Sequence, residues 1–232
     1  MHIGLIGGIG VAATVVYYQR LTATMSARGK RLELTIAHAQ TGDLVRNNNA
    51  DNRVAQAEIY ARLIDRLRAA GAECAAITSL GGHFCFEETK KISSLPLVSA
   101  VAPLDDYFAA EGLGRVGLLG TKVVMRTKLY GQLKKTEAVA IEDEIETLGQ
   151  SYQDMAIAGQ CDDALRALFL DAGRRLSEDQ GAEAVILAGT DLNLAFDGRE
   201  TGYRVIDALD IHVALLARIA AGEAPLDTAE AA

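Results

Sequence analysis

Four short glycine-containing segments each follow an apolar run, and three of them also carry hydroxyl, imidazole, ammonium or carboxylate side chains. They are residues 7–10 (GGIG), 78–85 (TSLGGHFC), 120–122 (GTK) and 188–191 (AGTD). Glycine lets backbone N–H groups approach a bound anion. Imidazole, carboxylate and activated hydroxyl groups transfer protons. The four segments therefore predict a site for a small anion at which a proton can be moved.

Three residues of these segments are the candidate catalytic groups. Ser79 follows a strand-like run, and His83 lies four residues further on, where it can activate Ser79 or act as the acid. Asp191 can supply a carboxylate base. Each residue also has a purely structural interpretation: Ser79 and Asp191 as helix caps, and His83 as a hydrogen-bond donor that supports the loop.

The candidate ligand-binding positions supply backbone N–H groups, hydroxyls or a guanidinium. Arg46 belongs to a polar stretch, Gln40–Asn52, which we expect to be a loop, and its fork of N–H donors suits a carboxylate. The expected positions are Gly8, Ile9, Gly10, Arg46, Thr121, Gly189 and Thr190.

The first glycine segment also fits a loose dinucleotide-binding pattern, G-x-G-x-x-A, over residues 8–13. That function needs an acidic residue at the end of the second strand. The second strand-like run ends Ala37-His38-Ala39-Gln40, without a carboxylate. The pattern therefore favours a tight turn or a carboxylate-binding loop over a site for NAD.

Composition limits the remaining classes of function. The net charge is -8 and no basic stripe occurs, which argues against a nucleic-acid partner. No apolar run is long enough to span a membrane, so we expect no membrane partner. The three cysteines, Cys74, Cys85 and Cys161, match no metal-binding spacing, so we expect no metal. We expect a reducing, cytoplasmic location.

Apolar runs of strand length alternate with amphipathic runs of helix length, which predicts an α/β fold with parallel, doubly wound sheets. The expected strands are His2–Gly7, Leu32–Ala37, Ala75–Thr78, Leu97–Val101, Val116–Leu119, Ala138–Ile141, Ala184–Leu187 and Tyr203–Ile206. The expected helices are Val11–Arg28, Val54–Ala70, Val123–Lys135, Asp162–Asp179 and Asp207–Ala221.

The pattern restarts near the middle of the chain. IGLIGGI (3–9) matches VGLLGTK (116–122), and GAECAAITSLG (71–81) matches GAEAVILAGTD (181–191). We expect a duplication, with residues 1–98 plus 208–232 as one half and 99–207 as the other. Ligands of parallel sheets bind beyond the carboxyl ends of the strands, so two facing halves would enclose one cleft.

These segments together resemble the aspartate/glutamate racemase superfamily over nearly the whole chain. The resemblance is carried by GLIGGIGVAATVVYY (4–18), VGLLGT (116–121), GAEAVILAGTDL (181–192) and IDALDIHV (206–213). It implies two similar flavodoxin-like halves related by pseudo-two-fold symmetry, a cleft between them, no cofactor and a homodimer. The reaction it implies is proton exchange at the α-carbon of an acidic amino acid.

The chain departs from that family at both thiols. The family motif Cys-Asn-Thr-Ala-His is matched by Ser79-Leu80-Gly81-Gly82-His83, and Cys-Thr-Glu by Gly189-Thr190-Asp191. Because serine is a far weaker acid than a thiol and glycine has no side chain, a two-thiol racemisation is not expected.

Two interpretations of function therefore stay open. In the first, an enzyme acts on a small carboxylate or amino acid by proton transfer, elimination or decarboxylation. In the second, a catalytically silent relative binds a small acid.

Overall fold

The computed structural model describes residues 1–226, so residues 227–232 of the predicted first half lie outside the described residues. Two four-stranded sheets form its centre, and every strand pair is parallel. The first sheet has the order β2-β1-β3-β4 and contains β1 (His2–Gly7), β2 (Glu33–His38), β3 (Cys74–Ile77) and β4 (Leu97–Val98). The second has the order β6-β5-β7-β8 and contains β5 (Arg115–Gly120), β6 (Glu137–Val139), β7 (Ala184–Ala188) and β8 (Val205–Asp207).

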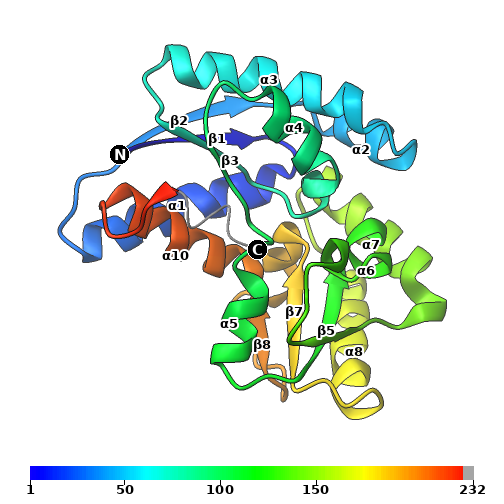
Figure 1. Cartoon of the computed structure of the whole chain (residues 1–232). Helices are drawn as coiled ribbons and strands as arrows, with labels where there is room; N and C mark the ends of the chain where they lie inside the picture. The colour runs from blue at the N-terminus through cyan, green and yellow to red at the C-terminus, as the bar shows by residue number, and fades with distance from the viewer. Residues whose placement is uncertain (227–232) are drawn as a thin grey trace.

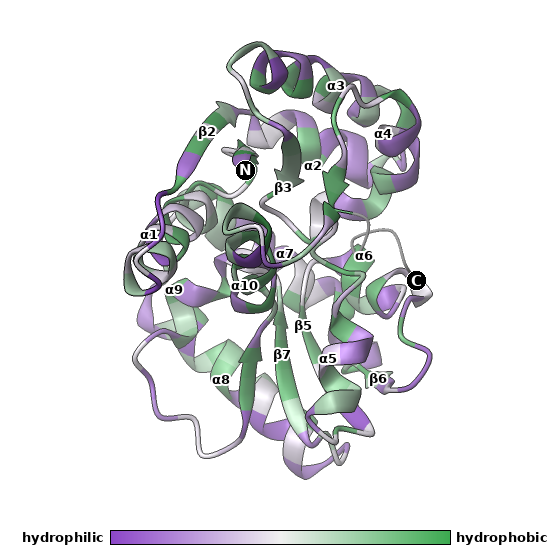
Figure 2. Ribbon diagram, turned by 60° about the vertical axis from the view of Figure 1, so that its left-hand side comes forward, coloured by the Kyte–Doolittle hydropathy of each residue, from purple (hydrophilic) through white to green (hydrophobic). Residues whose placement is uncertain are grey.

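The two strand orders correspond when the restart of the sequence pattern is taken into account. β1 and β5 occupy equivalent places, as do β3 and β7. The fold is therefore α/β with two similar flavodoxin-like halves, as predicted. Nearly all residues of these four strands are buried, which agrees with their continuous apolar runs. In Figure 2, β5 and β7 are largely green, while the helices around them also carry purple residues.

Helices cover the sheets (Figure 1). The helices that follow strands of the first sheet are α1 (Val11–Ala27), α2 (Thr41–Asn49), α3 (Arg53–Ala69), α4 (Phe86–Ile92) and α5 (Leu104–Ala110). Those that follow strands of the second are α6 (Lys122–Arg126), α7 (Ile145–Ala158), α8 (Asp163–Glu178), α9 (Asn193–Phe196) and α10 (Ala208–Ala220). Short 3-10 turns are η1 (Gly81–Cys85), η2 (Leu129–Gly131), η3 (Glu142–Glu144) and η4 (Thr190–Leu192).

The last helix returns to the first sheet. Figure 1 shows α10, in orange, beside the blue α1. Leu209, Val213 and Leu216 of α10 belong to the same buried cluster as Ile3 and Leu5 of β1. This packing supports the division that we propose for the chain, with residues 1–98 plus 208–232 in one half and 99–207 in the other.

The structure corrects the prediction of a loop at Gln40–Asn52, because Thr41–Asn49 form α2. Its sequence, TGDLVRNNN, contains weak helix formers, so local propensity does not indicate a helix. Tertiary contacts hold it instead. Leu44 is buried, the Thr41 hydroxyl donates to the Gly8 carbonyl at 2.6 Å, and the Asn47 amide donates to Gln56 at 2.9 Å.

Two further predictions differ from the structure in the second half. The helix expected over Val123–Lys135 ends at Arg126, since Lys128, Leu129 and Tyr130 all adopt positive φ angles. The long helix α7 lies outside the predicted elements. Its buried residues include Ile145, Leu148, Tyr152 and Met155, which have helical spacing.

Candidate functional site between the two halves

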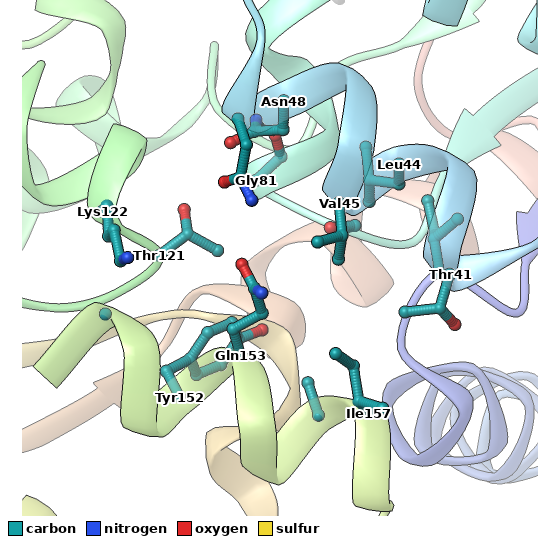
Figure 3. Close-up of a pocket in the computed structure, with 15 residues that line it drawn as sticks. Thr41, Leu44, Val45, Asn48, Gly81, Thr121, Lys122, Tyr152, Gln153 and Ile157 are labelled. Atoms are coloured by element: carbon teal, nitrogen blue, oxygen red, sulfur yellow. Dashed lines mark hydrogen bonds between the residues drawn. The ribbon is translucent and has the colours of Figure 1, made fainter. Parts of the chain in front are cut away.

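A small pocket lies where the two halves meet, with a volume of about 60 Å³. Figure 3 shows α2 on one side of it and α7 on the other. The first half contributes Ile9, Thr41, Leu44, Val45, Asn48, Asn49, Ser79 and Gly81. The second half contributes Thr121, Lys122, Gly149, Tyr152, Gln153, Ala156 and Ile157. The pocket is thus mostly apolar, with several hydroxyl and amide groups, and it suits a small ligand.

Ser79 lies just beyond the carboxyl end of β3 and lines this pocket. Its Oγ accepts a hydrogen bond from the Gly82 N–H at 3.1 Å, at the start of η1. The side chain is almost fully buried, with 5% of the residue exposed. Ser79 therefore caps a turn and faces the candidate site at the same time.

His83 is buried, and both of its ring nitrogens bond to backbone groups. The Ala100 N–H donates to Nε2 at 3.0 Å, so Nε2 must accept and Nδ1 carries the proton. Nδ1 lies 2.7 Å from the Ser79 carbonyl oxygen and donates to it. Burial lowers the pKa of His83 to about 4, although the Ser79 hydrogen bond opposes this shift. The ring holds the loop in place and does not bond to the Ser79 hydroxyl.

The carboxylate of Asp191 lies at the glycine loop of residues 8–10, which the sequence predicts to hold a ligand carboxylate. Its Oδ1 accepts a hydrogen bond from the Ala13 N–H, in the first turn of α1, at 3.0 Å. Its Cγ would lie only 2.9 Å from a Cβ built on Gly10, so glycine is needed there. Burial raises the pKa of Asp191 to about 6, against the opposing effects of its bonds to Ala13 and Tyr152. The anion at this helix N-terminus is therefore the chain's own carboxylate.

Gly8 also has a structural role, because its N–H group already has a partner within the protein. Its N–H donates to the Thr14 hydroxyl at 2.9 Å, and its φ of 85° suits glycine. Of the three residues of this predicted ligand loop, only Ile9 lines the pocket.

Tyr152 fills the space beside Gly189. A Cβ built on Gly189 would lie 2.7 Å from Cζ of Tyr152, closer than real Cβ contacts allow. The Tyr152 hydroxyl donates to Asp191 Oδ2 at 3.2 Å. Tyr152 comes from α7, which lies outside the predicted helices, although the spacing of Ile145, Leu148 and Met155 would have indicated it.

Of the other predicted positions, one lines the pocket, one lies at the contact between the halves and one is exposed. Thr121 lines the pocket and caps α6, its Oγ1 accepting from the Val124 N–H at 3.4 Å. Thr190 is buried and donates to the Thr78 carbonyl at 3.2 Å, across the two halves. Arg46 is exposed, pairs with Asp43 at 2.7 Å and does not line the pocket.

Leu80, which the resemblance aligns with an Asn, is fully buried among residues of the second half's core. Its carbonyl accepts a hydrogen bond from the Tyr130 hydroxyl at 2.8 Å. Leu80 therefore anchors one half to the other rather than offering a polar group to a ligand.

None of the cysteines supplies a thiol to the pocket. Cys74 and Cys85 are buried, and burial raises the pKa of each to about 12. Cys161 lies just before α8, and no cysteine lines the pocket. Within residues 1–226, no group of three or more histidine, cysteine or acidic side chains could hold a metal ion. No helix in this part of the chain is long and apolar enough to cross a membrane.

The protein thus has two flavodoxin-like halves with a pocket between them. Residues 6–216 match the family model described as Asp/Glu/Hydantoin racemase, and the chain belongs to that family of racemases.

Solved structures share the fold at low sequence identity. A candidate Asp/Glu racemase from Yersinia pestis is 21% identical, with a TM-score of 0.79 over 95% of this chain and 100% of that one. An aspartate racemase homologue from Pyrococcus horikoshii is 24% identical, with a TM-score of 0.74 over 95% and 99%. The aspartate racemase of Picrophilus torridus is 16% identical, with a TM-score of 0.74 over 95% of each chain.

Proposed function

We propose that this protein binds a small carboxylate or amino acid between its halves and moves a proton at the carbon next to the carboxylate, without a cofactor. One observation carries the proposal: Ser79, at the carboxyl end of β3, lines a small pocket that both halves enclose. Membership of a racemase family supports the same class of reaction. Because positions 79 and 189 hold Ser and Gly, the chemistry cannot use two thiols at these positions.

The ligand carboxylate is expected to lie on the side of Thr121 and Lys122. The glycine loop at the start of α1 already holds the Asp191 carboxylate, so a second anion there would be repelled. Figure 3 shows Thr121, Lys122, Gln153 and Asn48 around the pocket, and these side chains can donate hydrogen bonds. Lys122 is the cation among the described residues that line it.

Solvent deuterium exchange at the α-carbon tests the proposal. We would follow L- and D-aspartate and L- and D-glutamate by NMR with wild type, Ser79→Ala and Ser99→Ala. Ser99 is the matched control, since it is a buried serine that accepts N–H bonds from Val101 and Ala102 and does not line the pocket. Exchange that Ser79→Ala reduces and Ser99→Ala retains is the expected result. Wild type without exchange on any of the four would refute proton transfer on these substrates.

A second candidate is a catalytically silent protein that binds a small acid. The commitment of both His83 nitrogens to backbone groups favours it, because the imidazole cannot activate Ser79 in this arrangement. Calorimetric binding of the same four amino acids, together with absence of exchange, would identify this function. A lyase or decarboxylase of the same superfamily would instead consume its substrate, which the same NMR spectra would reveal.

A homodimer and a cytoplasmic location are further parts of the proposal. Val11, Val15 and Tyr18 expose apolar side chains along α1, between 48% and 52% of each residue, which suits contact with a second copy. Light scattering coupled to size exclusion measures the mass directly. A mass of one chain at working concentration would contradict the dimer.

A further inference from the structure

A residue from another part of the chain can take the place of the thiol that is absent at position 189. Matching the sequence to the family motif position by position does not identify this residue. Gly189 has no side chain, but the space beside it is not empty, because the ring of Tyr152 occupies it. Tyr152 comes from α7, 37 residues earlier in the chain, and lines the pocket together with Gln153. Ser79 lines the same pocket from the first half. A hydroxyl-bearing residue that lines the pocket thus lies at or beside the position of each absent thiol: Ser79 in the first half and Tyr152 in the second.

The Tyr152 hydroxyl belongs to a short hydrogen-bonded chain. It donates to Asp191 Oδ2 at 3.2 Å and accepts from the Asp191 N–H at 3.4 Å. Asp191 is buried, its other oxygen accepts from Ala13, and it forms no ion pair within residues 1–226 that would hold its charge. A buried carboxylate without a cation takes up a proton readily, and its raised pKa agrees with this.

We propose that Tyr152 is the proton-transfer residue of the second half and that Asp191 is its proton acceptor. This inference rests on the proposed function and assigns a residue to it. In the step, the α-carbon–hydrogen bond of the bound acid breaks and its proton passes to the Tyr152 oxygen. The phenolic proton moves at the same time to the Asp191 carboxylate. The electron pair of the broken bond is delocalised into the ligand carboxylate, and the reverse transfer restores the starting state.

The chemistry of tyrosine suits this role better than that of serine. The phenol has an unperturbed pKa of about 10, so it is a far stronger acid than an aliphatic hydroxyl. Burial and the nearby Asp191 carboxylate raise the pKa of Tyr152, which makes a free phenolate unfavourable. Proton transfer through Tyr152 therefore needs the acceptor to be in contact, and Asp191 is in contact. Ser79, whose hydroxyl has no such acceptor, then serves to hold the ligand.

Tyr152→Phe is the decisive variant, and Tyr130→Phe is its matched control. Tyr130 also lies in the second half and also loses a hydroxyl hydrogen bond, to the Leu80 carbonyl, but it does not line the pocket. We would measure α-proton exchange and calorimetric affinity for L- and D-aspartate and glutamate. Tyr152→Phe is expected to slow exchange at least a hundredfold and to change affinity less than threefold, whereas Tyr130→Phe retains both.

Asp191→Asn tests the acceptor in the same assays and is expected to slow exchange with affinity retained. Exchange in Tyr152→Phe at the wild-type rate would overturn this inference and leave the proposed function standing. Equal losses of exchange and affinity in Tyr152→Phe, or equal losses in both tyrosine variants, would make the role of Tyr152 structural. Absence of exchange in wild type would overturn the proposed function for these substrates, and this inference with it.

Discussion

The ring of Tyr152 lies against Gly189 so closely that no side chain fits at position 189. A Cβ there would lie 2.7 Å from Cζ of Tyr152 and 3.0 Å from the Gly120 Cα. The absence of a side chain at position 189 therefore depends on the position of the Tyr152 ring, since the two cannot occupy the same space. Restoring a residue at 189 requires that Tyr152 move.

Gly189→Cys is consequently expected to destabilise the protein rather than restore a thiol to the site. Overpacking a closed site typically costs about 1–3 kcal/mol. Thermal unfolding would show a lower Tm for Gly189→Cys, and Gly189→Cys should lower the Tm less in a Tyr152→Ala background than in wild type, because the space beside position 189 is then open. Gly42→Ala is the control, because it sits in α2 and a Cβ added there would have no neighbouring atom within 4 Å. Equal Tm values for wild type and Gly189→Cys would contradict this account.

Leu80→Asn, which introduces the residue type that the resemblance places at this position, is expected to weaken the fold without improving ligand binding. Leu80 is fully buried in the core of the second half. Removing its apolar surface and burying an amide there should cost about 3 kcal/mol. Urea unfolding measures the loss, and Leu80→Met, which keeps the volume, should cost less than about 1.5 kcal/mol. An Asn variant as stable as the Met variant would show that position 80 opens to the ligand.

Asp191 gives the protein a stability component that decreases as pH rises. Its pKa is raised to about 6 from an ordinary value of 3.8, so between these pH values the folded state binds more protons than the unfolded state. Stability should therefore fall by up to about 3 kcal/mol in total as pH rises through both pKa values, and by about 2 kcal/mol of this between pH 4 and pH 6. The loss of stability levels off about one pH unit above the folded-state pKa, near pH 7.

The difference between wild type and Asp191→Asn isolates this component. His83, with its pKa lowered to about 4, has the opposite slope over part of the same range, because protonation of the folded state is disfavoured. Asp207 has a pKa raised to about 6 as well, chiefly by burial. The contributions of His83 and Asp207 are the same in wild type and in Asp191→Asn, so they cancel in the difference between the two unfolding free energies. Unfolding free energies whose difference is constant from pH 4 to pH 7 would show that the Asp191 pKa is not raised.

Lys122→Met is expected to weaken binding of a carboxylate about tenfold. The Lys122 ammonium is partly buried at the pocket, where it donates to Gln150 at 2.9 Å and lies 3.7 Å from Glu146. A positive charge there attracts an anion, and the attraction should weaken as salt is added. Calorimetry at two salt concentrations tests this, with Lys128→Met as the control on an exposed lysine that does not line the pocket. Unchanged affinity in Lys122→Met would place the carboxylate elsewhere.

The sequence by itself determined where the strands lie, to within a few residues, and that they form two similar parallel halves. Continuous apolar runs such as His2–Gly7 and Ala184–Ala188 can only be buried between helices, and the restart at residue 116 predicted two similar halves. The position of Ser79 at a strand end followed from the same pattern. The helix α2 was missed because its residues are weak helix formers, and tertiary contacts stabilise it against its own propensity.

Only the tertiary structure decided what the candidate site residues do. The contact of Asp191 with Ala13 joins residues 178 positions apart, and that of Tyr152 with Asp191 joins residues 39 apart. Neither contact can be recognised from the sequence near either residue, because each depends on the tertiary packing of the chain. The same packing directs His83 to backbone groups, buries Leu80 and turns Arg46 to the solvent. The sequence therefore indicates which polar groups lie at the strand ends. The packing of the two halves determines which of these groups face the pocket.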